Sequence, residues 1–383
     1  MTLHHVSRRL FLAGILLARA TLAQESSVAS QAGPEDLARK SANFERLSQA
    51  ANVARNENHD DEAVRLYQQA LKLQPGWQEG IWYLSTLLYQ QEKFADSRDL
   101  LRRFVATEPQ AGPGWALLGM SEYQTREYSR ALDHLQRAMS LGTGGRKDLS
   151  QSVFYLVAVL LSRVERYDDS MNLLIPMLKS SDHPDLLVEP LGLAALHLPL
   201  LPLEIRPDRR EMIRLAGQCA LAVESQQQAE AEKLFSGMVG AYPDQPGVHF
   251  LYGAFLMDVR PEDGTREMKR ELEISPSHLG ARLRLAEEYV NEQRLEEALQ
   301  LAEEAVQLEP GSPLAHMILG EVLVARGDLA KGINELEHAR KQTPARVRIH
   351  WDLLRAYTSA GRTTDAKREK DDIEKLGSTE ARP

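Results

Sequence analysis

A proline recurs at intervals of 34 residues in two stretches of this 383-residue chain, at Pro75 and Pro109 and again at Pro276, Pro310 and Pro344. A fixed period of this length is typical of a solenoid, in which each repeat buries its apolar face only against its neighbours. Function in such an architecture comes from the surface that the stack presents rather than from a single catalytic cleft. The period therefore predicts the architecture and the mode of action but does not name a partner.

Small and aromatic residues recur at fixed distances from these prolines. One unit holds Trp115, Leu118, Gly119, Ala131 and Ala138, the spacing W-x2-L-G…A-x6-A. This pattern resembles the tetratricopeptide-repeat family, and the resemblance implies a hairpin of two helices, A and B, in each repeat. A small residue at the eighth position lets helix A approach helix B closely, and the proline ends helix B because it lacks an amide hydrogen.

The frame accounts for residues 36–376 as roughly eight to ten hairpins. Helical spacing dominates and little sequence alternates as a strand would, so we expect an all-α chain that forms a right-handed superhelical α-solenoid. Two positions depart from the frame: Phe104 and Glu271 stand at the twenty-seventh position, where a small residue is expected. The expected segments are a signal peptide 1–23, a polar linker 24–35, an N-terminal block 36–183 of about four repeats, an irregular Pro/Leu-rich helical connection 184–211, a C-terminal block 212–376 of about five repeats with a polar capping helix, and a disordered tail 377–383.

Residues 1–23 have the layout of an export signal, with Arg8 and Arg9 before an apolar run and small residues after it. The run is too short to span a bilayer, so we expect no membrane span after signal removal. The string around the two arginines resembles the twin-arginine export motif; that route, ordinary secretion and an uncleaved amphipathic anchor stay open. Each alternative places the repeats outside the cytoplasm, in the periplasm or secreted.

Charge and cysteine content exclude several classes of protein. The formal net charge is −9 and becomes −12 when the three arginines of residues 1–23 are removed, which argues against a nucleic-acid partner. Cys219 is the single cysteine, so no internal disulfide can form. Because it stands at a small-residue position of a helix A, we expect it to be a buried packing residue.

The sequence contains no convincing catalytic motif: H-E-x-x-H, G-x-S-x-G and paired Cys-x-x-Cys are absent. His249, His316 and His350 share the fourth position of helix A, but successive repeats separate equivalent atoms by about 10 Å, too far for one zinc ion. We therefore expect a protein that is not an enzyme and has no cofactor and no metal.

The resemblance implies that positions two, five, nine and twelve of successive A helices form a concave groove. These positions hold aromatic residues and a few charges, which suits an extended peptide or a partner helix; the alternative is that the aromatics pack between helices. The family's clamp for a C-terminal carboxylate is not matched, since only Asn52 fits at the N-terminal end. The candidate groove residues are Asn52, Arg55, Trp82, Tyr89, Tyr123, Tyr155, Phe250, Glu287, Trp351 and Arg355.

The segment 184–211 breaks the period, and its leucines and prolines predict a short helix near 186–197 followed by an apolar connection. It either folds back on its own repeats or forms a docking patch. The whole pattern predicts a non-catalytic scaffold that binds a protein or peptide outside the cytoplasm. The alternatives are a structural adaptor of an envelope polysaccharide or outer-membrane export assembly and, less favoured, an unrecognised hydrolase or transferase.

Overall fold

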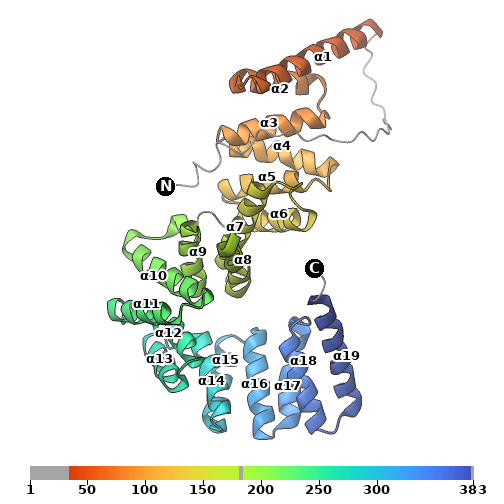
Figure 1. The fold of residues 1–383 in the computed structure, drawn as a ribbon. Coiled ribbons are helices and arrows are strands. Elements are labelled where there is room, and N and C mark those ends of the chain that lie inside the picture. Colours follow the sequence, from red (N-terminus) through yellow and green to blue (C-terminus); the bar gives the residue numbers. More distant parts are fainter. Residues whose placement is uncertain (1–33, 181–183, 381–383) are drawn as a thin grey trace. The chain divides into compact units, whose positions relative to one another are not determined.

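The computed structural model describes residues 34–180 and 184–380, so the predicted signal peptide and most of the predicted linker lie outside the described residues. Within these two ranges every regular element is helical and no strand occurs, which confirms the all-α prediction (Figure 1). The chain divides into two compact units, unit 1 (Met1–Asp182) and unit 2 (His183–Pro383). Each unit is described by itself.

Unit 1 is a series of antiparallel helical hairpins in which odd-numbered helices are the A helices and even-numbered helices the B helices. Its described helices are α1 (Pro34–Asn56), α2 (Asp60–Leu73), α3 (Gln78–Gln90), α4 (Phe94–Thr107), α5 (Gly112–Gln124), α6 (Tyr128–Leu141), α7 (Lys147–Arg163) and α8 (Tyr167–Ser180). The first helix begins at Pro34, two residues before the block was expected to start.

Unit 2 opens with an additional helix and then continues the hairpins. Its described elements are α9 (Asp185–Ala195), the 3-10 turn η3 (Pro202–Glu204), α10 (Pro207–Glu224), α11 (Gln228–Ala241), α12 (Val248–Met257), α13 (Pro261–Ile274), α14 (Leu279–Asn291), α15 (Leu295–Leu308), α16 (Pro313–Arg326), α17 (Leu329–Gln342), α18 (Val347–Ser359) and α19 (Thr363–Glu380). Helix α19 continues to Glu380, past residue 377, where the tail was expected to begin.

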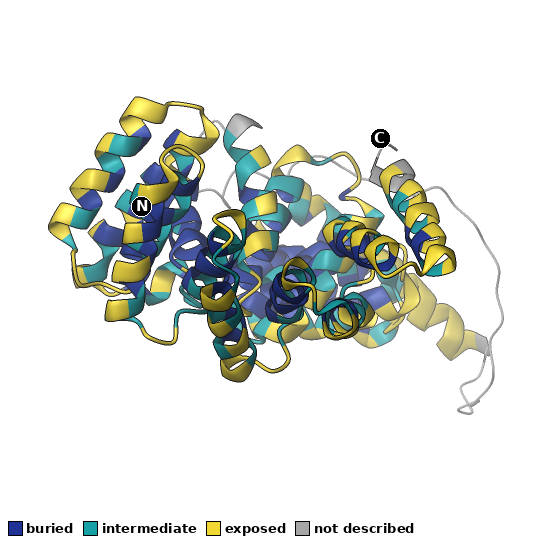
Figure 2. Cartoon of the chain, turned by 90° about the horizontal axis from the view of Figure 1, so that it is seen from below, coloured by how far each residue is buried: buried dark blue, intermediate teal, exposed yellow. Residues whose placement is uncertain are grey.

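The hairpins are tight because small residues stand where helix A crosses helix B. A Cβ added at Gly119 of α5 would lie 2.6 Å from Cγ of Leu135 in α6, and one added at Gly320 of α16 would lie 2.7 Å from Cγ of Leu336 in α17. Ala131, on the facing helix of the first pair, is fully buried. Figure 2 shows the result across the chain, with buried residues along one side of most helices and exposed residues along the other.

In each described hairpin except α12–α13, the turn between helices A and B places one residue in the left-handed region, at the fifteenth position of the repeat. Glycine fills this position at Gly327 and Gly361, where φ is +97° and +70°. The other turns hold a residue with a side chain, which is disfavoured at positive φ. Those residues are Asn58, Glu92, Arg126, Glu165, Gln226 and Gln293.

The segment 184–211 packs against its own repeats rather than standing out as an apolar surface. Helix α9 lies against α10 so closely that a Cβ on Gly192 would come within 1.8 Å of the carbonyl oxygen of Ile213. Leu187, Leu191 and Leu193 are buried in this contact. The apolar run is therefore mainly core rather than a docking patch, although α10 begins at Pro207, earlier than the repeat frame predicted.

The two departures at the twenty-seventh position are both accommodated. The Phe104 ring is buried and would contact a Cβ at Gly114 at 2.8 Å, so the absence of a side chain at Gly114 provides its space. Glu271 is fully buried, and its carboxylate accepts hydrogen bonds from the backbone N–H of Gly247 and of Phe250, at 2.8 and 3.2 Å. The glutamate thereby accepts from N–H groups at the start of α12 that have no acceptor within their own helix.

Candidate functional site

Within each unit, successive A helices contact one another directly and so form a shared face. In unit 2 this holds for α12 with α14, α14 with α16, and α16 with α18; in unit 1 it holds for α3 with α5 and α5 with α7. Positions two, five and nine of these helices lie on this A-helix face, so it is the surface on which the sequence predicted a ligand.

In unit 1 the candidate residues contact one another or a neighbouring helix. Asn52 accepts a hydrogen bond from the Tyr67 hydroxyl at 2.6 Å, and the Arg55 guanidinium lies 3.4 Å from the centre of the Tyr83 ring. The Trp82 ring is half-buried at 5.4 Å from Phe104. Tyr155 of α7 is also half-buried. Because of these contacts, only part of each candidate side chain is exposed to a ligand.

The prediction that Tyr89 and Tyr123 line an open groove is wrong, since each ring is only 6% exposed. Both stand at the twelfth position, where the ring packs on the aromatic residue that begins the B helix of the same hairpin. Tyr89 lies 5.1 Å from Phe94 and Tyr123 lies 5.7 Å from Tyr128. Burial raises the pKa of the Tyr89 hydroxyl to about 12.

In unit 2 the candidate residues separate into two groups. Phe250 is half-buried, 4.5 Å from the ring of His278, and belongs to local packing at the start of α12. Glu287, Trp351 and Arg355 belong instead to the A-helix face of α14 and α18. Trp351 is 50% exposed, which is unusual for the largest apolar side chain in a folded protein.

An arginine joins three successive repeats beside this tryptophan. Arg348 of α18 contacts Glu321 of α16 at 2.7 Å and Glu287 of α14 at 2.6 Å, both through Nη2. Its Nε donates to the other oxygen of Glu321 at 2.9 Å. Asp352, one turn after Arg348, pairs with Arg355 through Oδ1. We call Glu287, Glu321, Arg348, Asp352 and Arg355 the charge cluster.

Two observations show that negative charge is in excess within the charge cluster. Asp352 is 3% exposed, and Nε of Arg348 lies 4.0 Å from its Oδ2. Burial, a side-chain hydrogen bond with Asp352 and the charge of that carboxylate raise the pKa of Glu321 to about 8, against the opposing hydrogen bond and charge of Arg348. Burial alone would lower the pKa of Arg348, but Glu321 and Glu287 raise it. The guanidinium is therefore a permanent cation here.

Sequence reasoning selected Glu287, Trp351 and Arg355 but not the residues that connect them. Arg348 stands at the second position and Glu321 at the ninth position of their A helices, so the frame itself contained the signal for both. Asp352 stands at the sixth position, which faces inward, and no sequence rule would have chosen it.

The three histidines at the fourth position are structural residues. In each, Nε2 faces the carbonyl oxygen of the preceding repeat's proline at 2.8–2.9 Å, and Nδ1 faces a glutamate of helix B at 2.5–2.7 Å. Trp115 donates from its indole nitrogen to Pro109 in the same way, at 2.9 Å. The sets are His249 with Pro243 and Glu267, His316 with Pro310 and Glu335, and His350 with Pro344 and Glu369.

His350, Glu369 and Asp372 lie close enough to hold a metal ion, with their ligand atoms within 4.8 Å of one another. However, Glu369 already pairs with Arg340 and with His350, and the remaining nitrogen of His350 faces the Pro344 carbonyl. A cation would have to compete with the partly buried Arg340, so this group is better explained as a link between the last two hairpins.

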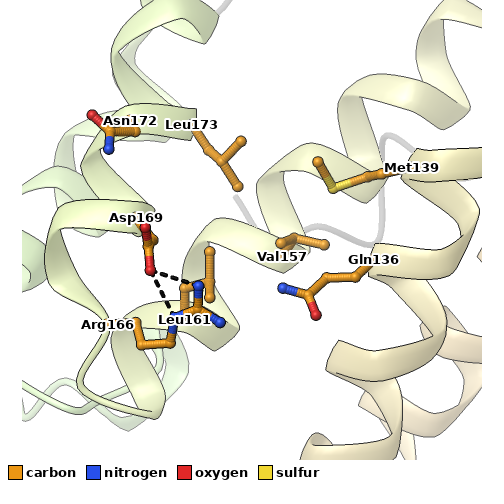
Figure 3. Close-up of a pocket in the computed structure, with 8 residues that line it drawn as sticks. All are labelled: Gln136, Met139, Val157, Leu161, Arg166, Asp169, Asn172 and Leu173. Carbon is orange, nitrogen blue, oxygen red and sulfur yellow. Dashed lines mark hydrogen bonds and ion pairs between the residues drawn. The ribbon is translucent and has the colours of Figure 1, made fainter. Parts of the chain in front are cut away.

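A shallow hollow of about 330 Å³ lies between α6, α7 and α8 of unit 1 (Figure 3). Val157 and Leu161 contribute its apolar lining, and the Arg166–Asp169 ion pair of 2.7 Å stands at one side. Both charged residues are about half exposed, so they offer no converging set of buried polar groups. In unit 2 Cys219 is fully buried in α10, and burial raises the pKa of its thiol to about 12, as expected of a packing residue.

Comparison with known families agrees with this geometry. Tetratricopeptide-repeat models match residues 84–145 in unit 1 and 289–349 in unit 2. The chain is a tetratricopeptide-repeat protein. This family consists of protein-interaction scaffolds, and that is the class to which the chain belongs. No curated protein matches the chain.

Solved structures of repeat proteins are similar at low identity. MamA from Desulfovibrio magneticus RS-1 is 18% identical over 44% of this chain and 95% of its own, with a TM-score of 0.37. A double mutant of MamA RS-1 is 16% identical over 45% and 97%, with a TM-score of 0.40. Yeast Tom70 is 12% identical over 88% and 85%, with a TM-score of 0.38. At these scores the assignment depends on the repeat matches and the hairpins themselves.

Among the helices described, none combines the length and the hydrophobicity that crossing a membrane requires.

Proposed function

We propose that this protein is a non-catalytic scaffold that binds a polypeptide on the A-helix face of unit 2, at α14, α16 and α18. The observation that carries the proposal is Trp351, half exposed beside a charge cluster drawn from three successive repeats. Exposed tryptophan and arginine are the residues that most often dominate binding energy at protein interfaces.

The chemistry of this face suits a peptide better than a small molecule. Its polar groups are spread over three helices, whereas a small-molecule site is a concave pocket that encloses most of its ligand. The charged residues already form ion pairs, so an incoming segment meets side chains held in place and loses less entropy on ordering them.

Peptide display against the purified chain tests this function. Random twelve-residue peptides are selected, and the affinity of labelled winners is measured by fluorescence anisotropy for wild type and Trp351→Ala. We expect Trp351→Ala to weaken binding at least tenfold, equivalent to about 1.4 kcal/mol. The matched control is Leu203→Ala, because Leu203 is 64% exposed elsewhere in unit 2. Selection of no peptide, or winners that bind both variants equally well, would overturn the proposal.

We further propose that the protein acts outside the cytoplasm, in the periplasm or secreted, and the support is the signal-like sequence of residues 1–23. Fractionation of cells that express the full chain tests it, with Arg8→Lys/Arg9→Lys as the variant. Export lost in this variant indicates the twin-arginine route, and export retained indicates ordinary secretion. A wild-type chain that stays in the cytoplasm contradicts the proposal.

A further inference from the structure

In each A helix from α12 to α18, the fourth position of the repeat holds a basic side chain. The four residues are His249, Arg282, His316 and His350. Each lies 2.5–3.0 Å from a carboxylate oxygen of a glutamate on helix B of its own hairpin. In the A helices before α12 the same position holds an apolar or aromatic residue: Leu47, Ile81, Trp115, Phe154 and Leu215. The fourth position therefore changes along the chain from a packing position to an ionic one.

Each of the three histidine rings has a hydrogen-bond acceptor at both nitrogens. In His316, Nδ1 lies 2.6 Å from a carboxylate oxygen of Glu335, and Nε2 lies 2.9 Å from the carbonyl oxygen of Pro310. A carbonyl oxygen can only accept, so Nε2 carries a hydrogen atom. A neutral imidazole has a single N–H group, so its Nδ1 would then turn a lone pair toward the Glu335 carboxylate. The geometry therefore requires one proton more than a neutral ring and an ionised glutamate supply.

We infer that His249, His316 and His350 are imidazolium ions in the folded chain and form three clamps that depend on a bound proton. We define a clamp as one histidine, its glutamate and its proline carbonyl. The extra proton resides on the ring rather than on the glutamate, because a carboxylic acid is the stronger acid. Each clamp joins the start of a helix A to the turn before it and to helix B of the same hairpin. The inference is independent of the proposed function, since no clamp residue belongs to the charge cluster.

Arg282 shows which charge state the fourth position accommodates. Its guanidinium, which is always charged, donates from Nε to Glu304 of α15 at 3.0 Å. The side chain of Arg282 is 14% exposed and that of His316 is 12% exposed. The repeats thus hold a permanent cation at the same position and to the same degree of burial. Trp115 of α5 is the neutral counterpart, with a single N–H that donates to the Pro109 carbonyl.

The charged and titratable groups around each ring come mainly from the B helix packed against it. In all three clamps a carboxylate makes the direct hydrogen bond to the ring, which favours the charged form. The neighbouring His338, Arg340 and Arg368 act in the opposite direction but do not replace this bond. The groups are Glu267 and Glu271 of α13 for His249, Glu335 and His338 of α17 for His316, and Glu369 and Asp372 of α19 for His350, with Arg340 of α17 and Arg368 of α19 in contact with Glu369.

Loss of the proton removes one hydrogen bond from each clamp. A neutral ring has one N–H for two acceptors, so either the proline carbonyl or the glutamate is left without its donor. The unfolded chain releases these protons at about pH 6.5, as ordinary histidines do, so the clamps stabilise unit 2 fully below about pH 6.5 and progressively less as the pH rises. This effect has the same sign as that of Glu321. Unit 2 therefore becomes looser in alkaline solution.

Nuclear magnetic resonance of the ring nitrogens tests the inference on the full chain. Protein labelled with nitrogen-15 is observed at about pH 7.5, where an ordinary histidine is mostly neutral. The three rings are assigned through His249→Gln, His316→Gln and His350→Gln. We expect both nitrogens of each ring to carry a hydrogen atom and to show the two similar shifts of an imidazolium ion. A ring with one protonated and one bare nitrogen would overturn the inference.

Glu335→Gln separates a clamp from an ordinary buried histidine. An amide can donate to a bare Nδ1 while Nε2 keeps its bond to Pro310, so we expect the ring of His316 to become neutral at the same pH. Glu303→Gln, at an exposed position of α15, is the matched control and should leave all three rings charged. A ring of His316 that stays charged in Glu335→Gln contradicts the clamp. If this variant fails to fold, the spectrum of the wild type alone decides.

Discussion

The A helices of unit 1 carry buried aromatic side chains at the twelfth position, whereas those of unit 2 carry charged side chains at the second and ninth positions. In unit 1 the rings of Tyr89 and Tyr123 are covered by the B helix of their own hairpin, and Trp82 leans on Phe104. In unit 2 Arg348 instead reaches across to two neighbouring repeats. The same repeat frame thus produces a face used for packing in one unit and a face with available polar groups in the other.

This difference follows from where each type of side chain finds its most favourable contacts. An aromatic ring gains most by leaving water, so it turns toward the nearest apolar surface, which is within its own hairpin. A guanidinium needs carboxylates and tolerates water, so it extends along the surface to acids of other repeats. The type of a residue therefore decides whether its side chain packs within its own hairpin or reaches the neighbouring repeats.

The largest expected effect is a loss of stability when a side chain is added where two helices cross closely, and it should differ between the two units. Gly192→Ala in unit 2 forces a Cβ against the backbone carbonyl of Ile213, which cannot move without displacing α10, and we expect a loss of roughly 3–5 kcal/mol. Gly119→Ala in unit 1 meets mainly the Leu135 side chain, which can change rotamer, and should cost about 1–2 kcal/mol.

Urea unfolding measures both, with thiol labelling of Cys219 reporting on unit 2 and tryptophan fluorescence in a Trp351→Phe background reporting on unit 1. Gly311→Ala is the control, since a Cβ there meets nothing within 4 Å. Equal losses at the two crossings would show that the α9–α10 contact is not closer in solution than an ordinary hairpin.

Restoring the family's small residue at the twenty-seventh position should destabilise both units. Phe104→Ala leaves a cavity beside Gly114 and should cost about 3–4 kcal/mol. Glu271→Ala leaves the N–H groups of Gly247 and Phe250 without acceptors and should cost about 2–3 kcal/mol. The same unfolding experiment checks both. Glu273→Ala, at an exposed position two residues away, should change little, and a stabilising Glu271→Ala would contradict the capping role.

The charge cluster should make unit 2, but not unit 1, sensitive to pH between about 5 and 8. The pKa of Glu321 is about 8 in the folded chain and near 4.5 when unfolded, so the folded state binds more protons in this range. Stability is therefore greatest below about pH 4.5 as far as this group is concerned, and it is lost as pH rises through 8. Cys219 labelling in urea at several pH values follows the slope, and Glu321→Gln should flatten it. A slope unchanged by this substitution would assign the effect elsewhere.

The smallest expected effect is a gain of stability in unit 1. All of its described A-to-B turns place a residue with a side chain at positive φ, whereas unit 2 uses glycine at Gly327 and Gly361. Arg126→Gly should therefore stabilise unit 1 by about 0.5–1 kcal/mol, because relief of strain exceeds the added freedom of the unfolded chain. Gly327→Ala is the reciprocal change and should destabilise unit 2. Thermal unfolding monitored by circular dichroism measures both, and a loss on Arg126→Gly would mean that the arginine side chain contributes more than its backbone costs.

The repeat period determined the fold of the described residues. Its signals are local ones. They are the 34-residue spacing, the small residues at positions eight and twenty, and Cys219 at a buried small-residue position. The structure has each of them where the repeat frame predicted it. The burial of 184–211 was also foreseeable, because an apolar run with internal prolines must be covered. The predictions for residues 1–23 lie outside the described residues and stay predictions.

Only the tertiary structure decided which of the framed side chains are available. The frame assigns Tyr89 and Trp351 to the same face, yet one is 6% exposed and the other 50%, because exposure depends on the partner that the next helix presents. The capping of α12 by Glu271 and the sharing of Arg348 between Glu287 and Glu321 join residues 21 to 61 positions apart. A period encodes the contacts within each repeat, but the rotation between repeats sets which distant side chains meet, and packing alone fixes that rotation.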